Sequence, residues 1–357
     1  MVICDKFAHL KGQLNRPVMS ALLIVNRTSG AGHSALTLKS LENSFQQQFQ
    51  ALIPHCLYAV VGSHEVAQQV THDFLYAFPP PWLVISGGGS GTHRAQIQAI
   101  MQAIESGVVI PDDVYISAIR LGSGNIIPKH LGLPLEPTLA LAQIAHGLCR
   151  NEMVPCAVYR CVSWDDNGRS QTHYGVTLAG IGQFGRVPQD IATWRQRHPR
   201  LMAQLLRYVP LETVNNWQYI AHSLLRAWRC IWHPDQAEWV TVEQDGRITS
   251  FPLFSGLLVN FDFSPLPFQS GCRINEPQLK LCILPQMSRR HMLAVLRRWR
   301  SLDNDVLTYD LTPERPITIH FHANQATTVA LDEDIFVMPG HLRFEVAPSL
   351  RFVTGGG

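Results

Sequence analysis

The stretch SALLIVNRTSGAG at residues 20–32 decides how the first part of this chain folds. Residues 20–25 form a short, mostly apolar run rich in branched side chains, which is typical of a parallel strand buried on both faces. The run ends abruptly, and a glycine-rich loop follows it directly. Beyond the loop, large apolar residues recur at spacings of three and four: Leu38, Leu41, Phe45 and Phe49. This spacing predicts an amphipathic helix on a sheet, and hence one strand-loop-helix unit.

The same alternation continues along the chain. Residues 57–61 are predicted to form a strand, and residues 63–78 a helix that Ser63 caps. A second buried strand at residues 82–86 runs into Gly-Gly-Gly-Ser-Gly-Thr, and a third at residues 114–119 enters Leu-Gly-Ser-Gly-Asn. Alternating strands and helices of this length predict a parallel α/β domain, with ligands at the carboxyl ends of its strands.

The pattern changes after about residue 150. The predicted strands there are separated by turns more often than by helices, as at residues 155–163, 252–259 and 279–284. Two helical insertions interrupt them, at residues 188–230 and 286–300. We therefore expect two domains: a parallel α/β domain at residues 18–150, and a mostly β, sandwich-like domain at residues 151–354.

Composition narrows the class of protein. The 357 residues are 46% hydrophobic and 16% charged, which is enough apolar material for two packed domains. The net charge of +2 argues against a nucleic-acid-binding protein. Apolar runs are too short to cross a bilayer, and residues 1–16 lack the apolar segment of a secretory signal, so we expect a cytoplasmic protein. The eight cysteines form no CxxC pair and are expected to be reduced structural thiols.

The three glycine-rich loops share one predicted edge of one sheet. Glycine allows backbone N–H groups to approach a ligand closely, and a helix N-terminus adds partial positive charge, so such loops favour phosphate. Neither the G-x-G-x-x-G pattern nor the G-x-x-x-x-G-K-[ST] pattern occurs at them. The loops therefore predict an anionic ligand without specifying a standard dinucleotide fold or a P-loop.

These motifs resemble those of the diacylglycerol kinase catalytic family of lipid kinases, which includes sphingosine kinases, and more distantly those of NAD kinases. Residues 26–32 resemble the family's Asn-Pro-x-Ser-Gly-x-Gly, and residues 88–92 stand where the family has Gly-Gly-Asp-Gly-Thr. Residues 121–125, with His-Leu-Gly-Leu-Pro at residues 130–134, resemble Leu-Gly-Thr-Gly-Asn and its trailing Leu-Gly-Ile-Pro. The order and spacing of the motifs agree with the family over nearly the whole chain.

The resemblance implies a nucleotide-binding first domain, a site between the two domains, and ATP and Mg²⁺ as cofactors. It implies phosphoryl transfer to a lipid hydroxyl, with nucleotide and lipid as partners, the lipid at a membrane surface. The nucleotide-binding residues that it implies are Asn26, Ser29, Gly30, Gly88, Gly89, Ser90, Gly91, Thr92, Gly122, Ser123, Gly124 and Asn125.

The chain departs from the family at the acidic positions. Ser90 replaces the Asp of the second loop, and Ala95 replaces a Glu expected shortly after it. Residues 275–277 match the family's Asp-Gly metal motif poorly, and residues 332–334 read Asp-Glu-Asp in place of Asp-Gly-Glu. Asp334 and Asp332 are the best remaining candidates for a catalytic base, and the metal ligands stay unassigned. The other interpretation of this acidic cluster is a polar turn between two strands.

Several alternatives stay open. A serine cannot supply the charge of a carboxylate, so a catalytically silent nucleotide- or lipid-binding regulatory protein is the main one. A dinucleotide-dependent oxidoreductase is weaker, because the first loop lacks G-x-G-x-x-G. The basic segment 288–300 and the Trp- and Arg-rich insertion are typical of a peripheral membrane contact or of helices that cover a sheet. The oligomeric state is not predicted.

Overall fold

The computed structural model describes residues 17–30, 34–122, 124–233, 238–262, 270–273, 278–297, 305–322 and 326–355. The chain divides into two compact units. The first unit contains the residues up to Cys156 together with Pro348–Gly357, and the second contains Ala157–Ala347. The divisions fall inside two strands, β5 (Met153–Trp164) and β15 (His341–Val353), which therefore contribute to both units.

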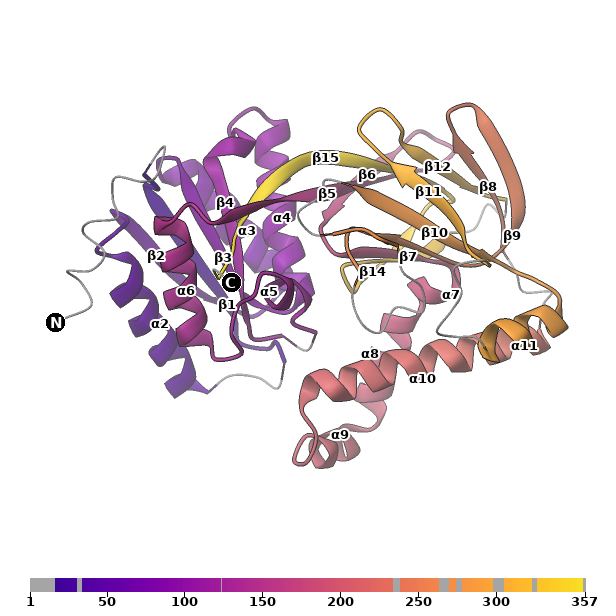
Figure 1. The fold of residues 1–357 in the computed structure, drawn as a ribbon, viewed down its shortest axis with the longest axis horizontal. Coiled ribbons are helices and arrows are strands. Elements are labelled where there is room, and N and C mark those ends of the chain that lie inside the picture. Colours follow the sequence, from indigo (N-terminus) through magenta and orange to yellow (C-terminus); the bar gives the residue numbers. More distant parts are fainter. Residues whose placement is uncertain are drawn as a thin grey trace. The chain divides into compact units, whose positions relative to one another are not determined.

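The first unit is built on a parallel sheet (Figure 1). Its strand order is β2 (His55–Val61), β1 (Ser20–Asn26), β3 (Trp82–Gly88), β4 (Val114–Arg120) and the end of β15. Every residue of β1 is buried, as the apolar run predicts. Residues 351 and 352 of β15 pair with Tyr115 and Ile116 of β4, so the sheet ends in a strand from the far end of the chain.

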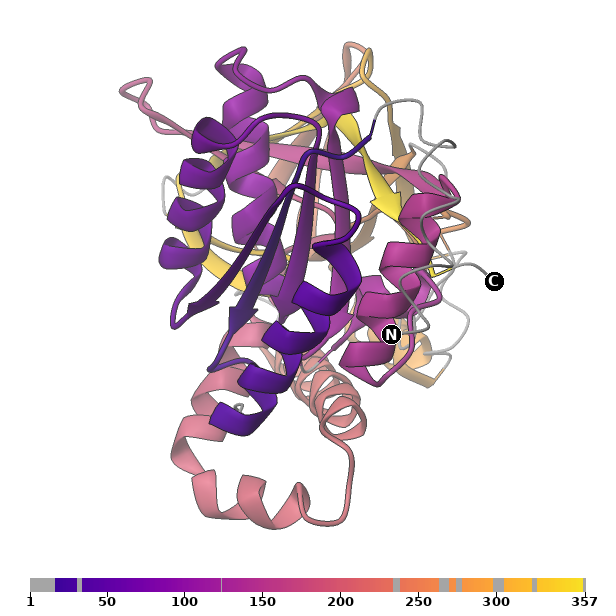
Figure 2. The same cartoon turned by 90° about the vertical axis from the view of Figure 1, so that its left-hand side faces the viewer.

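Helices cover both faces of this sheet. The helices are α2 (Ala35–Phe49), α3 (His64–Ala77), α4 (Ser90–Glu105), α5 (Ile126–His130) and α6 (Pro137–Cys149), with a short 3-10 turn η1 (Pro111–Asp113). Figure 2 shows α2 beside α6 on one face and α3 beside α4 on the other. The chain runs from β1 outward to β2 and then returns past β1 to β3. The loops after β1 and β3 therefore lead to helices on opposite faces, which is where parallel α/β sheets bind ligands.

The second unit is antiparallel and rich in strands. Its strands are β5, β6 (Ser170–Gly175), β7 (Leu178–Ile181), β8 (Glu238–Gln244), β9 (Arg247–Val259), β10 (Leu279–Pro285), β11 (Leu307–Leu311), β12 (Ile317–Phe321), β13 (Thr327–Leu331), β14 (Asp334–Met338) and β15. The long strand β9 pairs with β8 over residues 247–253, and its second half pairs with β7 and β10. The buried core between these strands includes Tyr159, Leu258, Leu281, Ile319 and Phe344.

Apart from α7 (Gly182–Gly185), which precedes the first predicted insertion, the helices of the second unit coincide closely with the two insertions. The first contains α8 (Val187–Arg197), α9 (Pro199–Leu205) and α10 (Leu211–Trp232), and the second contains α11 (Arg289–Arg297). Residues 298–300 of the predicted second helix lie outside the described residues. Among the described helices, none is both long enough and apolar enough to span a bilayer. Each cysteine in the described part of the chain is a free thiol. The predicted mixed α/β fold class with a strand-rich second part is confirmed.

Candidate nucleotide site and acidic turn

The three glycine-rich loops lie at one edge of the sheet of the first unit. β1, β3 and β4 are parallel neighbours, with Val25 in register with Gly87 and Gly88 in register with Arg120. The loops that leave these strands therefore begin at the same level. This arrangement confirms the prediction that they share one sheet edge.

Asn26 ties the first loop to the start of α4. Its side chain is buried, with 3% of the residue exposed, and its Nδ2 donates to Thr92 Oγ1 over 3.0 Å. Its Oδ1 accepts from the backbone N–H and the hydroxyl of Thr28, at 3.0 and 2.7 Å. The Asn26 amide thus stabilises the turn at Thr28 and also bonds to a residue 66 positions further along the chain. Only a side chain with a donor and an acceptor fits both roles.

Ser29 and Asn125 hold the first and third loops. The Ser29 hydroxyl donates to the backbone oxygen of Leu121 at 3.2 Å, as well as to that of Asn26 at 2.9 Å. Asn125 has a left-handed backbone with φ 48°, and its Oδ1 accepts from the N–H of Gly122 at 3.0 Å. Asparagine tolerates this conformation better than most residues, so it closes the third loop at little cost.

The second and third loops are in close backbone contact. A Cβ on Gly122 would lie 2.6 Å from Gly89 Cα and 2.9 Å from the backbone oxygen of Gly88. A Cβ on Gly88 would lie 2.5 Å from Thr92 Oγ1. A Cβ on Gly89 would meet no atom within 4 Å. The contact between the second and third loops therefore requires glycine at Gly122, the Thr92 side chain leaves no room for a Cβ at Gly88, and Gly89 borders open space.

The start of α4 is available to a ligand. Gly89 is its N-cap, and no side chain caps the first turn. Ser90, the first residue of α4, is half-buried, and Thr92, the third residue, is fully buried. Uncapped N–H groups and the helix dipole together favour an anion at such a helix start. The geometry fits the phosphate cradle that the sequence predicts.

The structure joins most of the predicted nucleotide-binding residues into one group. Hydrogen bonds or close approaches link Asn26, Ser29, Gly88, Gly89, Thr92, Gly122 and Asn125. Gly30 and Gly124 lie on the first and third loops, and Ser90 and Gly91 are the first two residues of α4. Ser123 and residues 275–277 lie outside the described residues.

His93 is a residue of this region that the sequence analysis did not select. It follows Thr92 on α4, is 3% exposed, and lies 5.7 Å from Phe352 between ring centroids. Neither ring nitrogen has a hydrogen-bond partner among the described residues, and burial lowers the pKa of His93 to about 4. A sequence signal did exist, because His93 stands four residues before Ile97 and seven before Ile100, which is the spacing of residues on one face of a helix.

Asp332 belongs to the second unit and is anchored there. It is 1% exposed, and its carboxylate accepts hydrogen bonds from the Tyr159 hydroxyl, the Thr177 hydroxyl and three backbone N–H groups, those of Val176, Thr177 and Leu178, at 2.6 to 3.0 Å. Burial raises the pKa of Asp332, and these hydrogen bonds oppose that increase. The carboxylate joins the segment after β6 to the end of β13, which is a structural role.

The acidic cluster forms a two-residue turn between β13 and β14. Asp332 and Glu333 both have positive φ, 47° and 74°, as the tight hairpin turn requires. Glu333 stands at a position that favours glycine, and its Oε1 accepts from the Tyr219 hydroxyl of α10 at 3.1 Å. Asp334 begins β14 and is half-buried. Of the two predicted acids, Asp334 is therefore the more accessible.

Comparison with known proteins finds a family match within the first unit and similar folds among solved structures. Residues 20–154 match the diacylglycerol kinase catalytic domain. The fold resembles the crystal structure of a diacylglycerol kinase from Bacillus anthracis str. Sterne, with a TM-score of 0.60, 14% identity, and coverage of 95% of this chain and 98% of that one. Yeast NADH kinase complexed with NADH gives a TM-score of 0.54 and 10% identity, covering 95% and 84% of the two chains. No curated protein matches the sequence.

At these identities the structural matches establish the fold, while the family match covers the three loops directly. All three loops lie within residues 20–154, as do the residues that link them. The diacylglycerol-kinase-like fold predicted from the motifs is confirmed. The predicted roles of individual residues stay predictions.

Proposed function

We propose that the three-loop edge of the first unit binds ATP and that the protein transfers the terminal phosphate to a lipid hydroxyl. The observation that carries this proposal is the junction of Asn26, Thr92, Gly89 and Gly122, which leaves open space beside Gly89 at an uncapped helix start. Backbone N–H groups of the loops and of the first turn of α4 would hold the phosphates. The match to the diacylglycerol kinase catalytic domain supports ATP as the nucleotide.

The transfer step needs a base for the acceptor. The lipid hydroxyl oxygen attacks the terminal phosphorus, the bond to the bridging oxygen breaks, and ADP leaves with the electron pair. The hydroxyl proton passes to a carboxylate, for which we propose Asp334, because Asp334 is half-buried whereas Asp332 is only 1% exposed. Mg²⁺ is implied by the family, but the described residues of the three loops include no carboxylate to hold it.

A second candidate function is nucleotide binding without turnover. Ser90 and Ala95 favour it, because both are neutral where the family has acids. Loss of one charge-stabilising group in an active site commonly lowers a rate by about a hundredfold or more. The two candidates agree on the nucleotide and differ only in the chemistry.

Nucleotide binding is tested at Gly89. Its φ of −79° suits any residue, and an added Cβ would contact nothing, so Gly89→Ala should fold with unchanged stability. If phosphate occupies the adjoining space, the methyl group should weaken ATP binding at least tenfold in calorimetry. Equal ATP affinity in the two proteins, or no ATP binding to the wild type, would overturn the proposed site.

Turnover is tested at Ser90. Phosphate transfer from ATP to diacylglycerol in mixed micelles with Mg²⁺ should be slow in the wild type and about a hundredfold faster in Ser90→Asp. Asp334→Asn should abolish the activity of both proteins. ATP binding with no transfer by either protein would instead support the silent candidate.

A further inference from the structure

Helix α10 exposes a continuous apolar face. Its exposed large side chains, with 38 to 71% of their surface accessible, are Trp217, Leu224, Leu225, Trp228 and Trp232. At 3.6 residues per turn, these positions fall within an arc of roughly 100°. Trp228 and Trp232 pack edge to face at 5.6 Å between ring centroids. We call this set the α10 tryptophan face.

Other sides of α10 pack against neighbouring helices of the second unit. Toward its start, Asn215 and Gln218 accept hydrogen bonds from Arg195 of α8, at 2.7 and 2.8 Å. Toward its end, Ala227 and Ile231 are buried in a cluster with Met292 of α11. The helix is therefore held firmly by its other sides. The tryptophan face is not needed for these contacts.

The charged residues of the helices α8 to α11 themselves are almost all basic, although Glu333 contacts Tyr219 of α10 and Asp305 contacts His291 of α11. Residues 187–233 and 289–297 contain no lysine, and their acidic residues are Asp190 and Glu212. Asp190 is already paired with Arg226 over 2.8 Å. The exposed arginines of α8 to α11 and of the segment that joins α9 to α10 are Arg197, Arg200, Arg207, Arg229, Arg289, Arg290 and Arg297.

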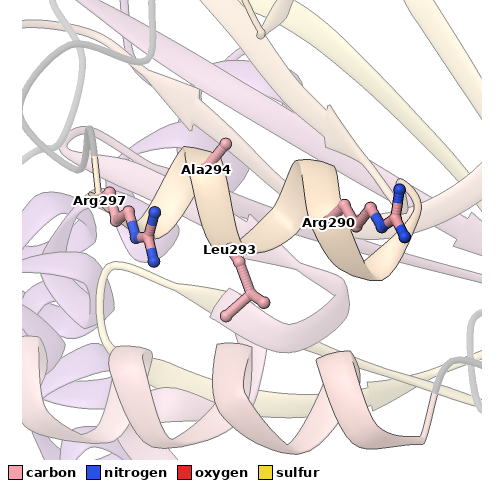
Figure 3. Close-up of a pocket in the computed structure, with 4 residues that line it drawn as sticks. All are labelled: Arg290, Leu293, Ala294 and Arg297. Atoms are coloured by element: carbon pink, nitrogen blue, oxygen red, sulfur yellow. The ribbon is translucent and has the colours of Figure 1, made fainter.

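Helix α11 adds to the same region. Arg290 and Arg297 stand two turns apart at an open hollow that Leu293 and Ala294 also line (Figure 3). Leu293 is 40% exposed and lies on the side of α11 that faces α10. Helix α11 therefore also exposes an apolar side chain, Leu293, between two arginines.

We propose that the α10 tryptophan face inserts into the interfacial layer of an anionic phospholipid bilayer while the neighbouring arginines contact the lipid phosphates. Tryptophan prefers the boundary between headgroups and acyl chains, and arginine pairs with phosphate. A protein partner of neutral surface would leave these arginines without counter-charges, whereas an anionic bilayer supplies both apolar depth and negative charge. The proposal deepens the proposed function, since a lipid acceptor resides in a bilayer.

The test is vesicle sedimentation of the full chain without nucleotide. Binding should be strong to vesicles of phosphatidylcholine with 30% phosphatidylglycerol, at least tenfold weaker to phosphatidylcholine alone, and weakened by 0.5 M salt. The combined variant Trp217→Gln, Trp228→Gln, Trp232→Gln should lose at least tenfold in binding. Arg290→Gln with Arg297→Gln should lose binding to the anionic vesicles only.

A matched control is present in the same unit. Trp239 on β8 is 53% exposed but lies outside the α10 tryptophan face, so Trp239→Gln should bind vesicles like the wild type. Circular dichroism checks that all variants fold. Equal vesicle binding by the triple variant and the wild type would overturn the proposal. So would a wild type that ignores vesicles and forms a dimer that the triple variant lacks, which would make the face a contact between two copies.

The outcome is separable from that of the nucleotide site. Gly89→Ala should sediment with anionic vesicles as the wild type does, and the triple tryptophan variant should retain ATP affinity in calorimetry. A triple variant that lost both would show general damage to the fold. In that case the variant that combines Arg290→Gln with Arg297→Gln decides the question. Unchanged binding of this variant to anionic vesicles would overturn the proposal.

Discussion

At the scale of single residues, His93 is a buried titratable group without a hydrogen bond to the described residues. Its folded pKa of about 4 lies below the ordinary value of 6.5, so between these pH values the unfolded chain binds a proton that the native chain does not. The free energy of unfolding should therefore fall by about 2 kcal/mol between pH 7.5 and pH 5. Urea unfolding of His93→Leu should show this pH dependence reduced by that amount.

The control for that experiment is His72→Leu, because His72 lies on α3 with 43% of its side chain exposed. The same pH series on this variant shows what replacing a histidine outside the core does to the unfolding curve. A His93→Leu protein that loses stability toward pH 5 as steeply as the wild type would show that His93 is not the group responsible.

Asp332 and Asp334 are also distinguished at the residue scale. Asp332→Asn places an amide N–H₂ against backbone donors that now bond to a carboxylate, so it should lower the free energy of unfolding by about 3 kcal/mol. Asp334→Asn, at a half-buried strand start, should cost less than about 1 kcal/mol. Urea titrations measure both. An Asp332→Asn protein as stable as the wild type would return Asp332 to the candidates for the base.

At the scale of elements, the second and third loops depend on the absence of a side chain at Gly122. A methyl group there would lie 2.6 Å from the Cα of Gly89, and both partners are backbone, so the loops must separate. Gly122→Ala should therefore cost about 1 to 3 kcal/mol of stability and should also weaken ATP binding. Thermal unfolding compares it with Gly89→Ala, which faces open space and should melt like the wild type. Equal melting of Gly122→Ala and Gly89→Ala would contradict the close packing.

At the scale of the whole molecule, the first unit needs the end of the chain. Leu350, Phe352 and Val353 are fully buried, Ser117 Oγ donates to the backbone oxygen of Val353 at 3.2 Å, and β15 pairs with β4. Each buried apolar side chain contributes about 1.5 to 3 kcal/mol. A protein of residues 1–156 should therefore unfold several kcal/mol more easily than one that carries residues 348–357 on a flexible linker. Urea unfolding followed by circular dichroism measures the difference, and equal stability would contradict the role of β15.

Sequence alone determined the first unit in most of its detail. The strands, the Ser63 cap of α3 and the three loops rest on features that are local in sequence: apolar runs, a period near 3.6, and glycines placed directly after strands. Parallel strands that alternate with helices place their carboxyl ends at one edge, so the shared edge could also be predicted. The turn at residues 332–333 was foreseen as one of two interpretations of the acidic cluster.

Only the tertiary structure decided how distant segments use their side chains. The Asn26 bond to Thr92, the burial of His93 against Phe352, and the anchoring of Asp332 by Tyr159 each join residues far apart in the chain. The return of β15 to the first sheet is of the same kind. Local sequence preferences do not specify which distant residues a side chain will contact, because these contacts depend on the packing of the complete fold. For this reason the sequence located the three glycine-rich loops, while the contacts of each polar residue emerged only from the folded chain.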